Sequence, residues 1–221
     1  MSKKQAIQKA LEHHQAGRLN QAEAIYHRIL KKEPNNPDTL HLAGVLAHQS
    51  GKNEEAINLI RQAISYRNAF PEAYCNLGNI LKIRGELTEA MSCYHKAIAL
   101  KPNLVGAHNN LGNIQRELGQ LDQAMSSYRQ VLAYEPNQAE AHYNLAITSK
   151  ELGKLEEAID SFRRAISIKP GVAEQHFNLA NVLVSRGSFD EALTHFRQAI
   201  SIKPDYTDAY INLGAVLHEQ G

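Results

Sequence analysis

Apolar and small residues recur at helical spacing along most of the chain. In residues 71–84 they mark one helix face, made of Tyr74, Leu77, Gly78 and Leu81. After Gly85 a second such face follows, made of Ala90, Tyr94, Ala97 and Ile98. No run of alternating β-branched residues between turn pairs appears, so the pattern predicts pairs of helices and an all-α fold.

This pattern of helix, turn and helix repeats at one constant step along the chain. Glycines keep the step at Gly17, Gly51, Gly85, Gly119, Gly153, Gly187 and Gly221. Alanines keep it at Ala22, Ala56, Ala90, Ala124, Ala158 and Ala192. We therefore expect a single array over residues 1–221, with repeats at 3–36, 37–70, 71–104, 105–138, 139–172 and 173–206 and a first helix of a seventh at 207–221.

Local signals suggest where each helix begins and ends. The turn glycine supplies the left-handed conformation that ends a first helix, and Pro102 and its equivalents end the second. Three residues after the glycine stands a capping type of side chain, and we expect these residues to be N-caps: Asn20, Thr88, Asp122 and Asp190. A small residue in the first helix, such as Gly78 or Ala146, would let its partner helix approach closely.

The combined pattern resembles the tetratricopeptide repeat, whose signature is W-x2-L-G-x2-Y, then A-x3-F, then P on a 34-residue step. Here the signature reads Y-C-N-L-G-N-I-L at 74–81, A-M-S-C-Y at 90–94, and Pro102. The opening Trp is replaced throughout by other residues, among them His108, His142 and His176. The resemblance implies a right-handed α-α superhelix with a long concave groove.

Composition narrows the classes of partner. Lys plus Arg is 24 and Asp plus Glu is 23, so a net charge of +1 gives no general attraction to nucleic acid or anionic membranes. No apolar run approaches the ~20 residues of a membrane span. Cys75 and Cys93 occupy places for small hydrophobic residues and are interpreted as reduced thiols. We expect a cytoplasmic protein that binds no nucleic acid, membrane or cofactor.

The sequence predicts no active site. The histidine ladder of His108, His142 and His176 occupies the aromatic place of the repeat. Its members would be roughly 8–10 Å apart in stacked helices, too far to share a metal ion at ~2.1 Å. Metal-protease, phosphate-loop and serine-hydrolase motifs do not occur. We therefore expect packing histidines, no metal site and no catalysis.

A second ladder is the strongest candidate for function. It consists of Asn76, Asn110, Asn144, Asn178 and Asn212. At about 100° per residue, Asn76 lies roughly 200° around its helix from Tyr74, so we expect an exposed row opposite the core. An amide both donates and accepts, so such a row can bind the backbone of an extended peptide with little regard to its sequence. Solvated residues inherited by repeat duplication are the alternative interpretation.

This row resembles that of the O-linked N-acetylglucosamine transferases, where it lines the lumen and holds protein substrates by their backbone. The resemblance puts the five ladder asparagines on the groove wall. Helix geometry places Asn79 on the same side as Asn76, and we expect Asn79, Asn113 and Asn181 to contribute to the peptide site as well. Leu42 replaces the asparagine in the second repeat, so the contacts should weaken toward the N-terminus. The family's carboxylate clamp is not expected, because Glu72, Glu140 and Glu174 put acid on the concave side.

A short basic row lies near the ladder, at Lys82, Arg116 and Lys150. Glu117 and Glu151 follow two of its members directly, which is typical of a solvated face, while a preference for acidic ligands is the alternative. Groove residues such as Cys75, Tyr143 and Phe177 would add selectivity.

The sequence therefore favours a non-catalytic scaffold for extended peptide segments of partner proteins. Two alternatives stay open. One is the substrate-recruiting arm of a larger glycosyltransferase or other transferase. The other is a module that self-associates through its terminal repeats, because helix 207–220 keeps apolar residues on a side that a terminal cap would make polar. If the ladder only binds ligand, replacing Asn110, Asn144 and Asn178 with Ala should leave stability nearly unchanged.

Overall fold

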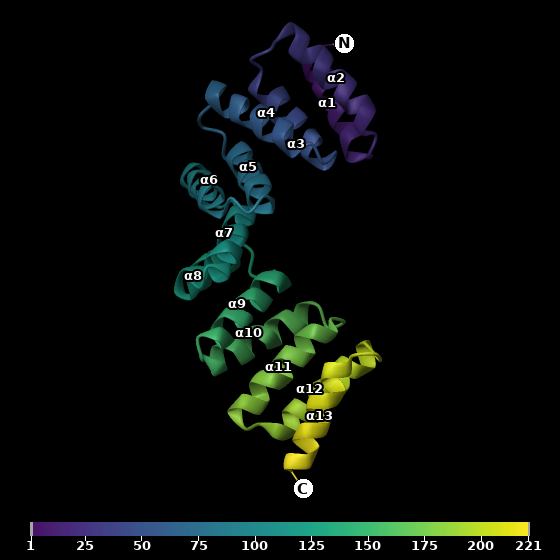
Figure 1. Cartoon of the computed structure of the whole chain (residues 1–221), viewed down its shortest axis with the longest axis vertical. Helices are drawn as coiled ribbons and strands as arrows, with labels where there is room; N and C mark the ends of the chain where they lie inside the picture. The colour runs from purple at the N-terminus through teal and green to yellow at the C-terminus, as the bar shows by residue number, and fades with distance from the viewer. Residues whose placement is uncertain (1, 221) are drawn as a thin grey trace. The chain divides into compact units, whose positions relative to one another are not determined.

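The computed structural model describes residues 2–220, which form thirteen α-helices and no strand (Figure 1). The helices are α1 (Lys3–Gln15), α2 (Leu19–Lys32), α3 (Pro37–Gln49), α4 (Asn53–Tyr66), α5 (Pro71–Ile83), α6 (Leu87–Leu100), α7 (Val105–Glu117), α8 (Leu121–Tyr134), α9 (Ala139–Glu151), α10 (Leu155–Ile168), α11 (Ala173–Arg186), α12 (Phe189–Ile202) and α13 (Thr207–Glu219). The predicted all-α class is confirmed. The expected turn glycine Gly221 lies outside the described residues.

The chain divides into two compact units, Met1–Asn110 and Leu111–Gly221. In the first unit α1 pairs with α2, α3 with α4 and α5 with α6, while α2 also contacts α3 and α4 contacts α5. In the second unit α9 pairs with α10 and α11 with α12, while α8 contacts α9, α10 contacts α11 and α12 contacts α13. Within each unit, therefore, successive helical hairpins pack on one another.

The turn glycines adopt the predicted conformation. Gly85 has φ of 80°, and its N–H donates to the carbonyl of Lys82 at 3.0 Å. The next N–H, of Glu86, donates to the carbonyl of Leu81 at 2.9 Å. These two bonds form a Schellman motif, which satisfies carbonyls at the end of α5 and turns the chain back at once.

The predicted N-caps are wrong. Each second helix begins two residues earlier than expected, after Arg18, Glu86, Gln120 or Ser188, and none of these four residues makes a side-chain capping bond. The reason is that the Schellman turn leaves a single connecting residue, whose carbonyl already accepts the first bond of the new helix, as Glu86 does from Ala90 at 3.0 Å. Asn20, Thr88, Asp122 and Asp190 lie in the first helical turn instead.

The expected close approach of paired helices is confirmed. A Cβ added to Gly78 would lie 2.8 Å from Cε1 of Tyr94, and one added to Gly112 would lie 2.8 Å from Cε1 of Tyr128. Real Cβ contacts are not this short, so the ring of the second helix occupies the space that a side chain would need. Ala146 and Ala180, at the same position of later repeats, are fully buried.

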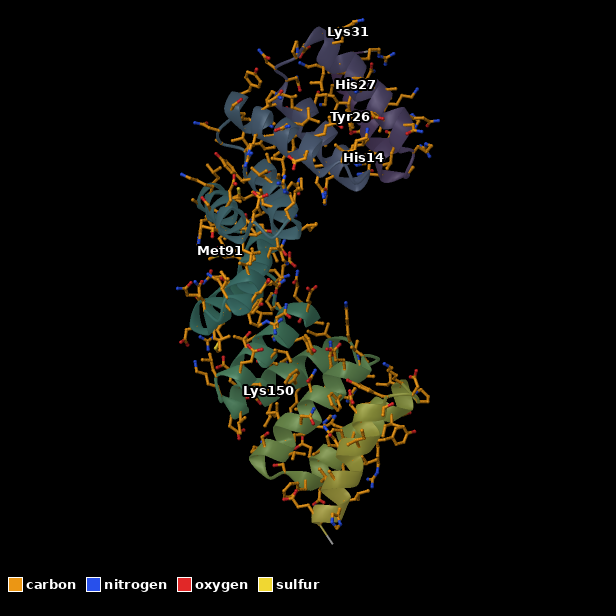
Figure 2. All side chains as sticks on the ribbon, in the orientation of Figure 1. His14, Tyr26, His27, Lys31, Met91 and Lys150 are labelled. Atoms are coloured by element: carbon orange, nitrogen blue, oxygen red, sulfur yellow. The ribbon has the colours of Figure 1, made fainter. Side chains whose placement is uncertain are left out.

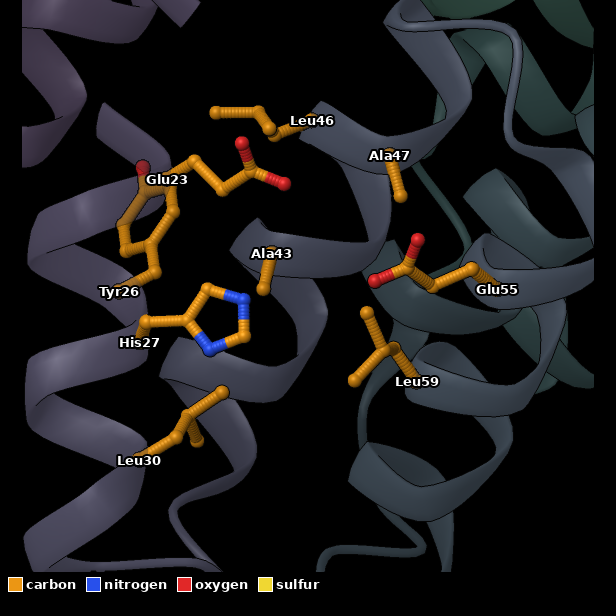
Figure 3. A pocket seen from close by; sticks show the side chains of 9 residues that line it. All are labelled: Glu23, Tyr26, His27, Leu30, Ala43, Leu46, Ala47, Glu55 and Leu59. Atoms are coloured by element: carbon orange, nitrogen blue, oxygen red, sulfur yellow. The ribbon is translucent and has the colours of Figure 1, made fainter. Parts of the chain in front are cut away.

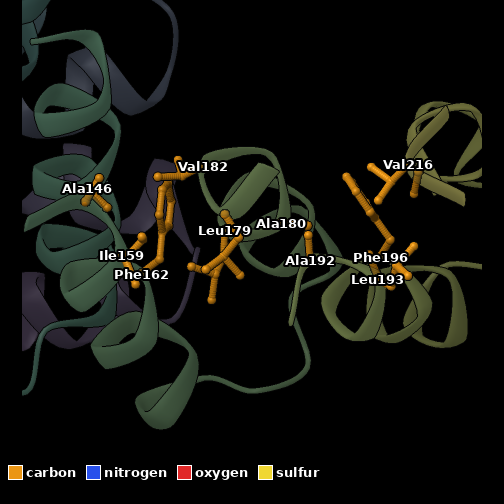
Figure 4. Packing of buried hydrophobic residues seen from close by; sticks show 14 residues of the cluster. Ala146, Ile159, Phe162, Leu179, Ala180, Val182, Ala192, Leu193, Phe196 and Val216 are labelled. Atoms are coloured by element: carbon orange, nitrogen blue, oxygen red, sulfur yellow. The ribbon is translucent and has the colours of Figure 1, made fainter. Parts of the chain in front are cut away.

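One core cluster of the second unit runs through successive hairpins from α9 to α13 (Figure 4). Phe162 of α10, Leu179 of α11 and Phe196 of α12 are fully buried in one cluster, which Val216 of α13 joins. A single hairpin has no such core, because its apolar face is covered by the next one. None of the helices in residues 2–220 has the length and apolar character required to span a bilayer.

Candidate functional site

The ladder asparagines lie on the first helices of successive hairpins, but they are not exposed as predicted. Asn144 is buried, with 8% of its surface exposed. Asn76, Asn110, Asn178 and Asn212 are half-buried. The angle of about 200° correctly put them away from their own partner helix. In a stack of hairpins, however, that side of the helix borders the preceding hairpin, so it is partly covered.

Each ladder amide donates a hydrogen bond to the preceding repeat. In three cases the acceptor is the side-chain oxygen of another asparagine, 31 residues earlier. The Nδ2–Oδ1 distances are 2.8 Å for Asn110–Asn79, 3.3 Å for Asn144–Asn113 and 2.8 Å for Asn212–Asn181. Six of the predicted site residues are therefore brought together in three pairs.

In the other two cases the residue 31 positions earlier is apolar, and another side chain of the preceding repeat accepts the bond. For Asn76 that apolar residue is Val45, and Nδ2 of Asn76 lies 2.8 Å from Nε2 of His41 instead. For Asn178 it is Ile147, and Nδ2 of Asn178 donates to Oη of Tyr143 at 3.0 Å. All five ladder amides thus contact the preceding repeat, through an asparagine or through a substitute acceptor.

Two of the accompanying asparagines, Asn79 and Asn113, are already engaged by their own hairpins. Oδ1 of Asn79 accepts a bond from Oη of Tyr94 at 2.9 Å, and Oδ1 of Asn113 accepts one from Tyr128 at 2.8 Å. Together with the ladder amides these bonds use both lone pairs of each oxygen. A buried tyrosine hydroxyl needs an acceptor of this kind. Asn79 and Asn113 therefore retain only their amide N–H groups for a ligand.

His41 is a neutral acceptor in this arrangement. Burial lowers the pKa of His41 to about 4, since the charged ring would lose its hydration. The ring also packs edge-on against Phe70, with centroids 4.7 Å apart. At neutral pH the unprotonated Nε2 can accept the bond from the Asn76 amide.

Three acidic residues of the first helices, Asp38, Glu72 and Glu174, are paired. Oη of Tyr143 donates to Oε1 of Glu174 at 2.7 Å, so the tyrosine links an acid and a ladder amide. Nζ of Lys101 lies 2.9 Å from Oε1 of Glu72 and lowers the pKa of that carboxyl through their hydrogen bond. Arg67 pairs with Asp38 at 2.6 Å.

The predicted basic row has members of two kinds. Arg116 is half-buried and forms an ion pair with Glu151 at 3.4 Å. Lys150, labelled in Figure 2, is exposed near the end of α9, and Lys82 is half-buried near the end of α5. Within residues 2–220 neither lysine forms an ion pair with a carboxylate.

The histidine ladder binds backbone carbonyls. Nε2 of His108 lies 2.8 Å from the carbonyl oxygen of Pro102, and the same contact recurs for His142 with Pro136 at 2.9 Å and for His176 with Pro170 at 3.1 Å. Each ring thus fixes the loop before its own helix, in keeping with the predicted packing role. No group of three potential metal ligands occurs in the part of the chain that the structure describes.

Both thiols are protonated at neutral pH. Burial raises the pKa of Cys75 and of Cys93 to about 11 in each case. A thiol of this kind is a poor nucleophile, because the thiolate is the reactive form.

Sequence reasoning missed the acceptors His41 and Tyr143. A signal for part of the network was present in two repeats, where an asparagine on the first helix occurs with a tyrosine on the second, as Asn79 with Tyr94 and Asn113 with Tyr128. The signal is not general, because Asn181 at the same position occurs with Phe196.

Comparisons with known proteins agree with this architecture. A family model described as TPR repeat matches residues 44–82, 78–115, 112–150 and 180–221, and one described as Tetratricopeptide repeat matches 139–171. No protein with curated functions matches the sequence.

Solved structures match over most of the chain. The structure of Pseudomonas aeruginosa pilF has a TM-score of 0.83 at 18% identity and covers 96% of each chain. That of YrrB, described as a TPR protein with an unusual peptide-binding site, has a TM-score of 0.76 at 20% identity and covers 85% of this chain and 96% of its own. MamA has a TM-score of 0.70 at 21% identity, with 75% and 96% covered. These likenesses establish the fold class, an all-α solenoid of helical repeats.

Proposed function

Because the chain belongs to the tetratricopeptide repeat family, we propose that it is a non-catalytic scaffold that binds extended segments of partner proteins. The ladder asparagines contact the backbone of the bound segment in this proposal. The finer resemblance to the repeats of O-linked N-acetylglucosamine transferases stays a prediction. So does the cytoplasmic location.

The observation that carries the proposal is the fixed orientation of the ladder amides. In each, one N–H donates to the preceding repeat. Within residues 2–220 the side-chain oxygen has no such partner, which leaves an acceptor and a second N–H for a ligand. An amide that is already held in place loses little freedom on binding, so its bonds contribute more to affinity.

The spacing of the row suits an extended chain. Equivalent helices of stacked hairpins lie about 10 Å apart, and an extended peptide rises about 3.4 Å per residue. One ladder amide therefore meets every third residue or so of a bound segment. Within each unit this register repeats, at Asn76 and Asn110 in the first and at Asn144, Asn178 and Asn212 in the second. Asn144 contributes least, because it is the most buried.

The proposal includes no catalysis, because the ladder histidines and the cysteines of the chain have structural contacts or raised pKa values. The ladder histidines bind proline carbonyls, and both thiols have raised pKa values. Neither group is prepared for nucleophilic or acid–base work.

The proposal is tested by binding of a library of unstructured fluorescent peptides to the native chain and to the double variant Asn178→Ala with Asn212→Ala. Two lost hydrogen bonds of about 1 kcal/mol each predict affinity at least tenfold lower. Asn58→Ala is the matched control, because it removes an exposed amide of α4 and leaves all five ladder amides in place. Equal affinity of the native chain and the double variant, with both folded by circular dichroism, would refute the proposal.

Self-association is a second candidate, favoured by one feature of α13. Tyr210 and Ile211 are 51% and 62% exposed, and Gly214 has no atom within 4 Å of its added Cβ. Apolar surface of this kind is typical of contact sites. If it drives association, sedimentation at increasing concentration should give a rising mass that Ile211→Lys abolishes. A constant monomer mass excludes this candidate.

A further inference from the structure

The apolar cavity between α2, α3 and α4 is too small for a ligand (Figure 3). Its volume of about 50 Å³ has room for a few water molecules at most. The two carboxylates that line it, of Glu23 and Glu55, share the ammonium of Lys52 at 3.1 and 3.9 Å. These acids thus have a cation within the chain, unlike three acids of the second unit.

The three acids of the second unit lie one helical turn before its ladder asparagines. Glu140, Glu174 and Asp208 precede Asn144, Asn178 and Asn212 by four residues in each case. Side chains four residues apart lie on the same face of a helix, with about 5–6 Å between their Cβ atoms. All three acids are exposed. They therefore follow the ladder from hairpin to hairpin, and we call these three residues the acid row.

In the first unit the equivalent acids are neutralised by the chain itself. Nζ of Lys101 lies 2.9 Å from Oε1 of Glu72, and a guanidinium nitrogen of Arg67 lies 2.6 Å from Oδ1 of Asp38. Both cations stand 29 residues after their acid. A bound segment therefore meets little net charge at these two pairs.

In the second unit this pairing does not occur among the residues that the structure describes. Glu140, Glu174 and Asp208 form no ion pair within residues 2–220. Lys203 stands 29 residues after Glu174, but its Nζ lies over the ring of Tyr206, 5.0 Å from the centroid. The acid row therefore presents unbalanced negative charge beside the ladder.

Glu174 is also held in a fixed position. Its Oε1 accepts a hydrogen bond from Oη of Tyr143 at 2.7 Å, and the same Oη accepts one from Nδ2 of Asn178 at 3.0 Å. The carboxylate is thus two hydrogen bonds away from a ladder amide. Burial raises the pKa of Tyr206, and Glu174 and Asp208 raise it further, so both carboxylates lie near that hydroxyl. A carboxylate held in this way loses little freedom when it binds a cation.

We propose that the second unit selects segments with a Lys or Arg at every third residue, and that the acid row binds these basic side chains. This inference rests on the proposed function, since the ladder contacts the backbone of the same segment. A polyproline II chain advances about 9 Å in three residues and then presents its side chain on the same side again. Equivalent helices of stacked hairpins are about 10 Å apart. Successive basic side chains therefore meet successive acids, in charge-assisted hydrogen bonds.

The first test compares peptides of three identical triplets, Lys-Ser-Ala, Gln-Ser-Ala or Glu-Ser-Ala, each acetylated, amidated and fluorescently labelled. Fluorescence anisotropy with the full chain at about 50 mM salt should give at least tenfold higher affinity for the Lys peptide than for the Gln peptide. At about 500 mM salt this advantage should shrink to less than threefold, because exposed charges are then screened. Equal affinity of the Lys and Gln peptides at low salt, or tighter binding of the Glu peptide, overturns the proposal.

The second test removes charge from the acid row and keeps its shape. The double variant Glu174→Gln with Asp208→Asn should bind the Lys peptide about tenfold more weakly and the Gln peptide as before. The matched control, Glu156→Gln with Asp160→Asn, removes the same charge from α10, where these side chains are 75% and 79% exposed. It should leave both affinities unchanged. Equal losses in the two double variants, both folded by circular dichroism, would show that only net charge matters and would contradict the assignment.

A third comparison separates this inference from the proposed function. A peptide with three lysines at every second residue has the same charge but the wrong spacing, and it should bind at least threefold more weakly than the Lys triplets. If the Gln peptide binds and lysine adds nothing at either spacing, the ladder still binds backbone and the acid row does not take part. If none of the peptides binds, the proposed function and this inference fail together.

Discussion

Asn178 illustrates how one side chain can stabilise the fold and remain available to a ligand. Its Nδ2 donates to Tyr143, and Tyr143 in turn donates to Glu174. The expectation that ladder asparagines can be removed without effect on stability therefore has to be given up. Their loss leaves an acceptor on the preceding repeat without its donor.

Single replacements at this network should be mildly destabilising. Asn178→Ala and Tyr143→Phe should each lower the free energy of unfolding by about 1 kcal/mol. The double variant should lose less than the sum, because both changes break the same bond. Urea titrations of the four proteins measure this coupling. Strictly additive losses would contradict the bond between the two side chains.

Stability should depend on pH through His41. The pKa of His41 is about 4 in the folded chain, against 6.5 for the ordinary side chain. Below pH 6.5 the unfolded chain therefore binds a proton that the folded chain does not. The free energy of unfolding therefore does not depend on His41 above this pH, and it falls as the pH decreases toward 4.

Between pH 7 and pH 5 the free energy of unfolding should fall by about 2 kcal/mol because of His41. Urea titrations at the two pH values check it, with His41→Phe as the comparison. The variant should be spared this loss, because its ring cannot bind a proton. An NMR titration in which folded His41 becomes protonated near pH 6.5 would show that the ring is not desolvated as described.

At the scale of the helix, the sequence predicted the turns and the close contacts but not the helix starts. Positive φ at Gly85 and the contact of Gly78 with Tyr94 follow from local sterics, which the residue types alone determine. The failed N-caps, such as Thr88, depend on how tightly the turn closes. That is a property of the whole hairpin, which propensities at one position do not reveal.

Two glycines at equivalent positions of the repeat should respond oppositely to substitution. Gly78→Ala puts a methyl group 2.8 Å from the ring of Tyr94, and overpacking of this kind costs about 1–3 kcal/mol. Gly214→Ala meets no atom within 4 Å and should gain up to about 1 kcal/mol of helix propensity. Thermal unfolding of the two variants compares them directly. If Gly78→Ala is neutral, the close contact between α5 and α6 is not as described.

At the scale of the whole molecule, the constant repeat period was sufficient to predict the all-α repeat fold, because within each compact unit a hairpin contacts its neighbours in sequence. The candidate site was only partly predictable. The period located every ladder asparagine, but the burial of Asn144 and the acceptor role of His41 depend on the side chain of an adjacent repeat. The regular recurrence of an asparagine does not show which side chain of the neighbouring hairpin it contacts.

The central claim, that the ladder amides read the backbone of an extended segment, is tested most directly by backbone N-methylation of a bound peptide. Each methyl group removes one N–H and leaves every side chain unchanged. We expect affinity to fall about tenfold at positions roughly three residues apart and to change little between them. If N-methylation has no effect at any position while side-chain substitutions abolish binding, the asparagine row does not read the backbone and the account is wrong.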